Sequence, residues 1–227
     1  MTDGFQQALR LELRKELVLG LEVLELDLDD AQVELLLDYL AMIEKWNRVY
    51  NLTAVRDPGE MLTHHVLDSL AVVGPLLRET EGRPIRLLDV GSGAGLPGVV
   101  IAIACPQVEV TCVDTVAKKA AFIQQVSAAS GLVNLRGLHA RVESLDRRRG
   151  EGHDVIVSRA FASLSDFVHW SGGALQVGGV WMALKGKHPQ AEIDALPSTV
   201  DVFHVEPVAV PGLKADRCIV WMRERLG

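Results

Sequence analysis

LLDVGSGAGLPGVVIAIA, residues 87–104, is the stretch that decides the fold. An apolar segment with strand character runs directly into a glycine-rich bend, and an apolar helical run follows at once. Glycines in such a bend permit positive φ angles and remove the Cβ atoms that would hold backbone amides away from a ligand. We therefore expect a strand, a ligand-binding loop and a helix, in that order.

The glycine spacing indicates which kind of cofactor this loop binds. A dinucleotide fingerprint, G-x-G-x-x-G, would need glycine at position 96, where the chain has Leu96. Gly91, Gly93 and Gly95 match the spacing of S-adenosylmethionine-dependent methyltransferases instead. Leu96 and Pro97 also partly block the helix N-terminus that a pyrophosphate would use. The alternative is a tight turn that binds no ligand.

A carboxylate follows at the end of the next predicted strand, which runs from residue 108 to Asp114. Neighbouring parallel strands end at the same edge of a sheet, so Asp114 can accept hydrogen bonds from the ribose hydroxyls of a ligand on the glycine loop. Loop and carboxylate together are far more specific than either is alone. This pairing makes the ligand-free turn the weaker interpretation.

From residue 85 onward, short apolar runs alternate with helical segments, which is typical of βαβ units around a parallel sheet. We expect an α/β protein with a Rossmann-like, class I methyltransferase fold, in which a mostly parallel twisted sheet ends in an antiparallel C-terminal hairpin. The predicted strands are residues 85–90, 108–114, 134–140, 154–158, 180–184, 200–210 and 217–223, and the predicted helices are 98–104, 117–130 and 164–175.

The first 80 residues have a helical pattern instead. Apolar side chains between Val33 and Ile43 recur with the period of an amphipathic helix, which Asp29 or Asp30 would cap. Another helix is predicted to begin at Asp57-Pro58, with a buried stripe at positions 62, 66, 70 and 73. We expect a helical extension, residues 1–80, followed by an S-adenosylmethionine-binding domain, residues 81–227.

Composition and charge narrow the class of protein. A chain of 227 residues with 48% hydrophobic content can bury a core without disulfides or metals, and its three cysteines have no zinc-site spacing. No apolar run reaches the roughly 18 residues of a membrane span, and the N-terminus has no signal-peptide pattern. We expect a cytoplasmic, monomeric protein with no membrane contact. A net charge of -7 argues against binding nucleic acid by bulk electrostatics, although local basic clusters remain available.

The end of the fourth predicted strand should face the methyl group, because ligands bind beyond the carboxyl edge of such sheets. The segment from Ser158 to Phe161 has neither the Asn/Asp-Pro-Pro-aromatic pattern of exocyclic-amine methyltransferases nor a nucleophilic cysteine. An acceptor with a free lone pair, such as guanine N7, needs no general base, since its alkylation releases no proton. We therefore expect no catalytic acid or base, and transfer by positioning alone.

Two residues of this segment have competing interpretations. Arg159 suits a cofactor carboxylate or a phosphate better than proton transfer, and a salt bridge at the strand end is an equal alternative. Phe161 could stack on an extruded base, or belong to the core. His64 and His65 lack ligand spacing and are interpreted as structural, so no metal site is expected.

Longer segments of the chain resemble the bacterial family of small-subunit ribosomal RNA methyltransferase G, also called glucose-inhibited division protein B. The segments are KWNRVYNLTAVRDPGEMLTHHVLDSL at 45–70, LLDVGSGAGLPGVVIAI at 87–103, RVESL at 141–145, SRAFASL at 158–164 and ALKG at 183–186. The resemblance implies transfer of a methyl group from S-adenosylmethionine to N7 of one guanine in the 530 loop of 16S ribosomal RNA. The implied partner is 16S ribosomal RNA or a small-subunit assembly intermediate.

The resemblance also assigns residues to the cofactor. It implies that Gly91, Leu96, Val142, Glu143 and Arg159 hold S-adenosylmethionine, in addition to the loop glycines Gly93 and Gly95 and the carboxylate of Asp114. Contacts with RNA are assigned only from position and charge or aromatic character. They are Asn51, Phe161, Lys185 and Arg147 with the basic loop up to residue 149, and a solvated surface is the alternative for the charged ones.

Two other functions stay open at this point. The acidic balance and the lack of a dedicated RNA-binding module would suit a methyltransferase that acts on a small molecule or a protein. A nucleotide-binding or division-associated interaction protein without enzymatic activity is the third hypothesis.

Overall fold

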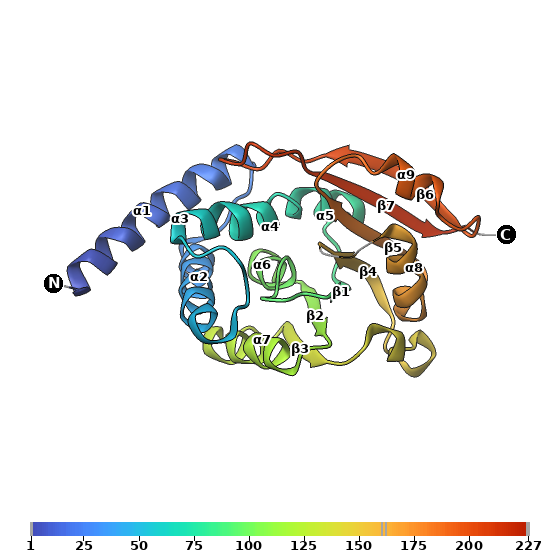
Figure 1. Ribbon diagram of the computed structural model, residues 1–227, viewed down its shortest axis with the longest axis horizontal. Helices are drawn as coiled ribbons and strands as arrows, with labels where there is room; N and C mark the ends of the chain where they lie inside the picture. The colour runs from blue at the N-terminus through green and yellow to red at the C-terminus, as the bar shows by residue number, and fades with distance from the viewer. Residues whose placement is uncertain (1, 160, 162, 226–227) are drawn as a thin grey trace.

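The computed structural model describes residues 2–159, 161 and 163–225. Within these ranges a seven-stranded sheet has the order β3-β2-β1-β4-β5-β7-β6 (Figure 1). The first five strands are parallel, and β7 runs antiparallel to both β5 and β6. The strands are β1 (Ile85–Val90), β2 (Val108–Asp114), β3 (Leu135–His139), β4 (His153–Ser158), β5 (Leu175–Lys185), β6 (Val200–Pro207) and β7 (Cys218–Glu224). The predicted Rossmann-like fold with a C-terminal hairpin is confirmed.

Helices α6 (Gly98–Ala104) and α7 (Ala117–Ser130) have the predicted bounds. The helix predicted for 164–175 ends earlier, as α8 (Leu164–Ser171) followed by the 3₁₀ turn η4 (Gly172–Ala174). Strand β5 accordingly begins at Leu175 rather than at the predicted residue 180, and it runs through Gly178 and Gly179. A register shift in the β4–β5 pairing accommodates these glycines, so the strand continues through them. Short elements complete this half: η2 (Val142–Ser144), η3 (Arg147–Arg149) and α9 (Gln190–Asp194).

The N-terminal part is helical, as predicted. Asp29 caps α2 (Asp30–Tyr50) in a capping box with Gln32, and Asp57 caps α3 (Pro58–Met61) by accepting from the amide of Glu60. The predicted buried stripe at positions 62, 66, 70 and 73 is buried. The other helical elements are α1 (Thr2–Val23), η1 (Leu62–Leu67, a π-helical stretch), α4 (Asp68–Leu70) and α5 (Val73–Thr80).

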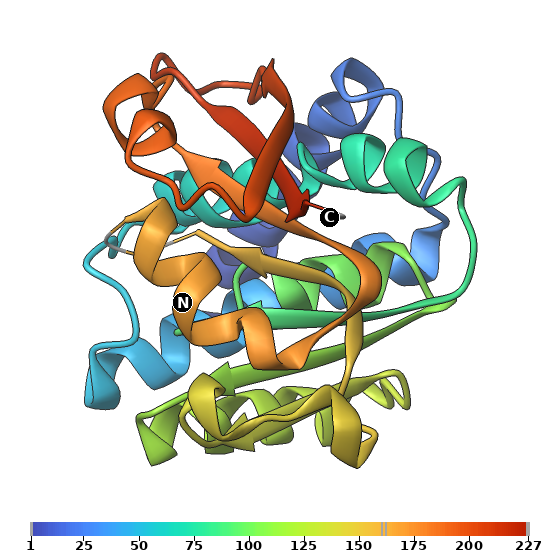
Figure 2. The ribbon, with the colours of Figure 1, turned by 90° about the vertical axis from the view of Figure 1, so that its right-hand side faces the viewer.

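Two hydrophobic clusters cover the two faces of the sheet. Alternate residues of β1 divide between them, because successive side chains of a strand point to opposite faces: Leu87 packs with α6, α7 and the N-terminal helices, and Leu88 packs with α8. Figure 2 shows α8 in front of the sheet and the blue N-terminal helices behind it. Within the part of the chain that the structure describes, no helix is long and apolar enough to cross a membrane.

Candidate functional site

The glycine loop joins β1 to α6 at the carboxyl edge of the sheet. Gly91, Gly93 and Gly95 have φ angles of 69°, 60° and 92°, as the sequence predicts. A Cβ atom at Gly91 or Gly93 would find no other atom within 4 Å, whereas one at Gly95 would overlap the side chain of Val99. The first two glycines therefore leave open space above the loop, and the third allows the loop to pack on α6.

Asp114 lies against this loop at the end of β2. Its Oδ2 accepts from the amide of Gly93 at 3.0 Å, and its Oδ1 accepts from the amide of Val116 at 2.8 Å. The ammonium of Lys119 lies 3.7 Å from Oδ2. Because each carboxylate oxygen has a second acceptor direction, Asp114 can shape the loop and still accept ribose hydroxyls.

The segment after β3 reaches the same edge. The amide of Ala140 donates to the carbonyl oxygen of Asp114 at 3.3 Å, which places the following 3₁₀ turn beside the carboxylate. Val142 of this turn is buried in the cluster that contains α8, and Glu143 is exposed. Leu96 lies on the opposite face of the sheet from Val142, because its side chain belongs to the hydrophobic cluster that contains α6 and α7. Its amide donates to the carbonyl oxygen of Ser92.

Asp89 is a buried residue of this site that the sequence interpretation missed. It lies in β1 beneath the loop with no exposed surface, and its Oδ2 accepts from the amide of Gly98 at 2.9 Å. Burial raises the pKa of the Asp89 carboxyl to about 7. Within the described part of the chain, neither its Oδ1 nor the hydroxyl of Ser92 has a hydrogen-bond partner. An acidic residue inside an apolar strand, just before the first glycine, was the available signal.

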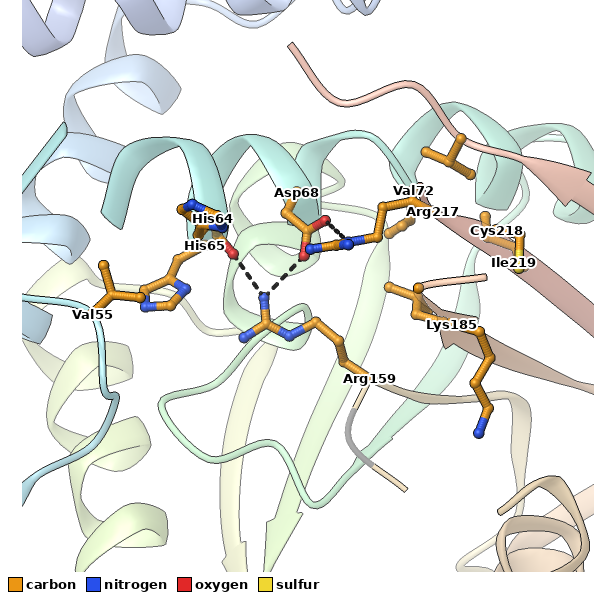
Figure 3. A pocket seen from close by; sticks show the side chains of 13 residues that line it. Val55, His64, His65, Asp68, Val72, Arg159, Lys185, Arg217, Cys218 and Ile219 are labelled. Carbon is orange, nitrogen blue, oxygen red and sulfur yellow. Dashed lines mark hydrogen bonds and ion pairs between the residues drawn. The ribbon is translucent and has the colours of Figure 1, made fainter. Parts of the chain in front are cut away.

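Arg159 lies at the end of β4, beside the start of the glycine loop. The hydroxyl of Ser158 donates to the carbonyl oxygen of Val90 at 2.9 Å, which ties the two strand ends together. Nη1 of Arg159 donates to the carbonyl oxygen of His64 at 3.1 Å and to Oδ2 of Asp68 at 3.2 Å (Figure 3). The salt bridge named as an alternative is therefore present. A guanidinium has five N–H donors, so Arg159 keeps donors for an anionic ligand.

A cavity of about 310 Å³ lies next to Arg159, where β4 and β5 end and β7 begins (Figure 3). Its charged wall contains Asp68, Arg159 and Arg217, and Nε of Arg217 lies 2.7 Å from Oδ1 of Asp68. Apolar side chains form the remaining wall, among them Val55, Val72, Leu184, Val208 and Ile219. The cavity thus combines flat apolar surface with a few convergent polar groups, which is typical of a small-ligand site.

The two histidines also lie at this cavity. His65 is buried and its Nε2 lies 2.8 Å from the hydroxyl of Thr53, and burial lowers the pKa of its imidazole. Both features agree with the structural interpretation of His65. Among the described residues, no group of three or more His, Cys, Asp or Glu side chains could hold a metal ion.

The four residues assigned to RNA are not brought together. Lys185 lines the cavity, but its ammonium pairs with Glu192 at 2.7 Å and points away from Asp68 (Figure 3). Phe161 is half-buried and packs against Phe167 and Trp170, with ring centroids 5.4 and 5.5 Å away. Asn51 is exposed at the end of α2 in a left-handed conformation.

Arg147 lies at the opposite edge of the sheet, because η3 precedes β4 and Arg159 follows it. Its Nη1 donates to the carbonyl oxygen of Leu175, where β5 begins, at 2.9 Å and pairs with Glu224 at 3.2 Å.

Solved structures share the fold at low sequence identity. TrmN from Thermus thermophilus matches with a TM-score of 0.56 and 22% identity over 72% of this chain, which spans 53% of that protein. A SAM-dependent methyltransferase from Aquifex aeolicus matches with a TM-score of 0.52 and 16% identity, over 73% of this chain and 98% of that one.

The residues at the carboxyl edge fit an adenosyl cofactor. Open space lies above Gly91 and Gly93, a carboxylate with free acceptor directions lies beside it, and Arg159 offers donors at the other end. A sheet in this order with such a site defines a Rossmann-like, S-adenosylmethionine-dependent methyltransferase.

Sequence relatives identify the family within this class. A family model described as rRNA small subunit methyltransferase G matches residues 32–220, and the chain belongs to this family. Proteins named ribosomal RNA small subunit methyltransferase G are similar along almost their whole length. The one from Polaromonas naphthalenivorans is 63% identical over 93% of this chain and 96% of its own, and the one from Albidiferax ferrireducens is 61% identical over 94% and 98%.

Proposed function

We propose that the chain transfers a methyl group from S-adenosylmethionine to N7 of one guanine in the 530 loop of 16S ribosomal RNA. The observation that carries this proposal is the placement of a cavity of about 310 Å³, with one charged and one apolar wall, beside Arg159 at the same sheet edge as the glycine loop and Asp114. Family membership supplies the ribosomal RNA substrate.

Eight residues would hold the cofactor in this proposal. Asp114 binds the ribose hydroxyls, and Val142 with Glu143 frames the adenine. Arg159 binds the methionine carboxylate through donors not engaged by Asp68. Gly91 and Gly93 allow the close approach, while Gly95 and Leu96 shape the loop. When bound, S-adenosylmethionine supplies a methyl group activated by the positive charge on its sulfur.

The target guanine would enter the cavity between the helical segment 62–70 and the ends of β4 and β5. Apolar walls suit the faces of an extruded base, and polar groups at the rim suit its edges. Guanine N7 has a lone pair and no proton to lose, so the chain needs to position the base rather than deprotonate it. The carboxylate of Asp68 lies in this wall, where it pairs with the guanidinium groups of Arg159 and Arg217 and offsets part of their positive charge beside the base.

Contacts with RNA beyond the target base belong to the same proposal. Lys185 is the last residue of β5, Phe161 follows β4, and Asn51 lies at the end of α2. Arg147 would contact RNA only where the RNA extends to the opposite sheet edge. We also propose that the protein acts as a cytoplasmic monomer, and that residues 1–80 form an extension to a cofactor-binding domain of residues 81–227.

Mapping of ribosomal RNA by mass spectrometry tests the proposed function. Cells that lack the protein should lose one N7-methylguanosine from 16S ribosomal RNA, and the intact chain should restore it. Asp114→Ala and Arg159→Ala should fail to restore it, whereas Lys15→Gln on the exposed side of α1 should succeed. Unchanged methylation in the deleted strain would overturn the proposal.

Two assays of the purified protein test the rival functions, which are a small-molecule or protein methyltransferase and a non-enzymatic interaction protein. Methylation of cell metabolites or proteins, with stripped 16S ribosomal RNA unmodified, would favour a small-molecule or protein methyltransferase. No heat on calorimetric titration with S-adenosylmethionine or S-adenosylhomocysteine would favour an interaction protein without enzymatic activity.

A further inference from the structure

Helix α2 of the N-terminal part contacts the glycine loop directly. The hydroxyl of Tyr39 donates to the carbonyl oxygen of Ala94 at 2.7 Å, across 55 positions of the chain. Tyr39 has no exposed surface, and Ala94 lies between Gly93 and Gly95. The hydrogen bond therefore joins a core side chain to the middle of the loop.

The tyrosine ring is held in place from the other side. It stacks on Phe122 of α7, with ring centroids 6.4 Å apart and an interplanar angle of 28°. Burial raises the pKa of the Tyr39 phenol well above its ordinary value, so the hydroxyl keeps its proton and stays a donor. Packing fixes the direction in which the hydroxyl donates, and the carbonyl oxygen of Ala94 accepts this hydrogen bond.

A second contact from the same helix holds the far end of α6. Nε2 of Gln32 donates to the carbonyl oxygens of Ile103 at 2.8 Å and Ala104 at 3.3 Å. Gln32 and Tyr39 are two helical turns apart and so lie on one face of α2. One face of α2 therefore donates hydrogen bonds to the glycine loop through Tyr39 and to the last turn of α6 through Gln32.

These contacts bear on the loop because glycine has more conformational freedom to lose than any other residue. A loop with three glycines is ordered only if something outside it limits its motion. Ordering it before the ligand arrives lowers the free-energy cost of binding.

We propose that Tyr39 is a positioning residue for S-adenosylmethionine, which fixes Ala94 and so preorganises the glycine loop. Helix α2 is then a functional part of the cofactor site, with Gln32 as its second anchor. The proposal rests on the proposed binding of the cofactor at this loop.

Calorimetric titration of the full-length protein with S-adenosylmethionine tests this role. Tyr39→Phe removes only the hydroxyl, and we expect the Kd to rise about 3- to 10-fold, as loss of one buried hydrogen bond predicts. In methylation assays the KM for the cofactor should rise by a similar factor, with little change in kcat or in the KM for RNA. If the hydroxyl of Tyr39 only stabilised the fold, its removal would not raise the KM for the cofactor selectively.

Two control variants separate positioning from general stability. Thr80→Val removes another buried hydroxyl that donates to a backbone carbonyl, that of Leu76 at 2.8 Å, in a helix that leads to the opposite sheet edge. Tyr50→Phe alters the chain's other tyrosine, which is exposed. Both should bind the cofactor as the unmodified chain does. A Kd for Tyr39→Phe within 2-fold of the unmodified protein, or an equal loss in Thr80→Val, would overturn the proposal.

Hydrogen exchange gives a readout that needs no cofactor. Amides of residues 91–98 should exchange faster in Tyr39→Phe, and those of 108–114 should not. Suppose that the unmodified chain binds no cofactor, but residues 91–98 still exchange faster in Tyr39→Phe than in the unmodified chain. The proposed function would then fail, while the ordering of the loop by Tyr39 would stand. If neither segment changed, the positioning role would fail while the proposed function stood.

A second variant covers the case in which Tyr39→Phe does not fold. Gln32→Glu keeps an acceptor for the capping box and removes the donor to Ile103 and Ala104. It should speed exchange in α6 and the loop and weaken cofactor binding by about 2- to 5-fold, as loss of one partly exposed hydrogen bond predicts. Unchanged exchange and affinity in this variant would also overturn the role of α2.

Discussion

Nη1 of Arg159 lies 3.2 Å from Oδ2 of Asp68, a residue 91 positions earlier in the chain. The other oxygen of Asp68 accepts from Nε of Arg217 at 2.7 Å, so one buried carboxylate joins the helical segment 62–70, the end of β4 and the start of β7. Together with the end of β5, these three segments line the cavity next to Arg159. Asp68 therefore sets where the guanidinium of Arg159 points.

Asp68→Asn should reduce both stability and activity. Breaking a buried ion pair costs about 3–5 kcal/mol, and because both arginines are partly exposed we expect a loss of roughly 2 kcal/mol in the free energy of unfolding. Methylation should fall at least 10-fold as Arg159 loses its anchor. Urea denaturation and a methylation assay measure the two effects. Asp38→Asn, at an exposed pair with Arg10, is the matched control, and equal behaviour of the two variants would contradict the assignment.

Asp114→Asn should weaken cofactor binding. The amide oxygen of Asn can replace only one of the two carboxylate oxygens that accept from the amides of Gly93 and Val116, and the charge that strengthens hydrogen bonds to ribose hydroxyls is gone. We expect the Kd for S-adenosylmethionine to rise about 10- to 100-fold, since hydrogen bonds to charged groups contribute about 1.5–3 kcal/mol. Calorimetry measures this change. Glu109→Gln, an exposed position on the same strand, should bind normally. If Asp114→Asn left the Kd for S-adenosylmethionine unchanged, the proposed contact between Asp114 and the ribose would be wrong.

Lys185 and Arg147 test how far RNA extends over the protein. Replacing either by glutamine should lower affinity for 16S ribosomal RNA and reduce the slope of log affinity against log salt by about 1, as expected for one phosphate contact. Lys185→Gln should also slow methylation, because only Lys185 lines the cavity. Filter binding across a salt series measures the slope, with Lys15→Gln as the charge-matched control. A residue whose loss leaves affinity and slope unchanged is not an RNA contact.

Asp89→Asn should change how stability depends on pH. Burial raises the pKa of Asp89 from 3.8 to about 7, so the folded state holds a proton that the unfolded chain has already released. Its stabilising contribution is full below pH 3.8 and is lost as the pH rises towards 7. Asparagine does not ionise, so the variant should lose less stability than the unmodified chain over this range. The difference should grow by up to about 1.4 kcal/mol per pH unit and then level off.

Urea denaturation between pH 5 and 8 measures this dependence. The matched control is Asp27→Asn, at an exposed position, which should follow the unmodified chain. Parallel stability curves for Asp89→Asn and the unmodified chain would show that the Asp89 carboxyl does not titrate in this range.

Local pattern was sufficient for the central elements of the sheet. The bounds of β1, β2, α6 and α7 follow from the apolar pattern, with a glycine directly after β1 and after α7, and Gly91, Gly93 and Gly95 adopt the expected positive φ. Strand β5 shows where local pattern stopped being informative. The predicted start of the strand is residue 180, but it begins at Leu175, and it pairs with β4 on one side and β7 on the other.

The sequence alone predicted the fold class, the glycine loop and the position of Asp114 beside it, because periodicity, turn chemistry and the shared edge of parallel strands are short-range properties. Tertiary structure decided which partners those groups have. Asp68 meets Arg217 across 149 positions of the chain, and Tyr39 meets Ala94 across 55. No local propensity encodes such contacts, since they form only when separate helices and strands pack around a common core.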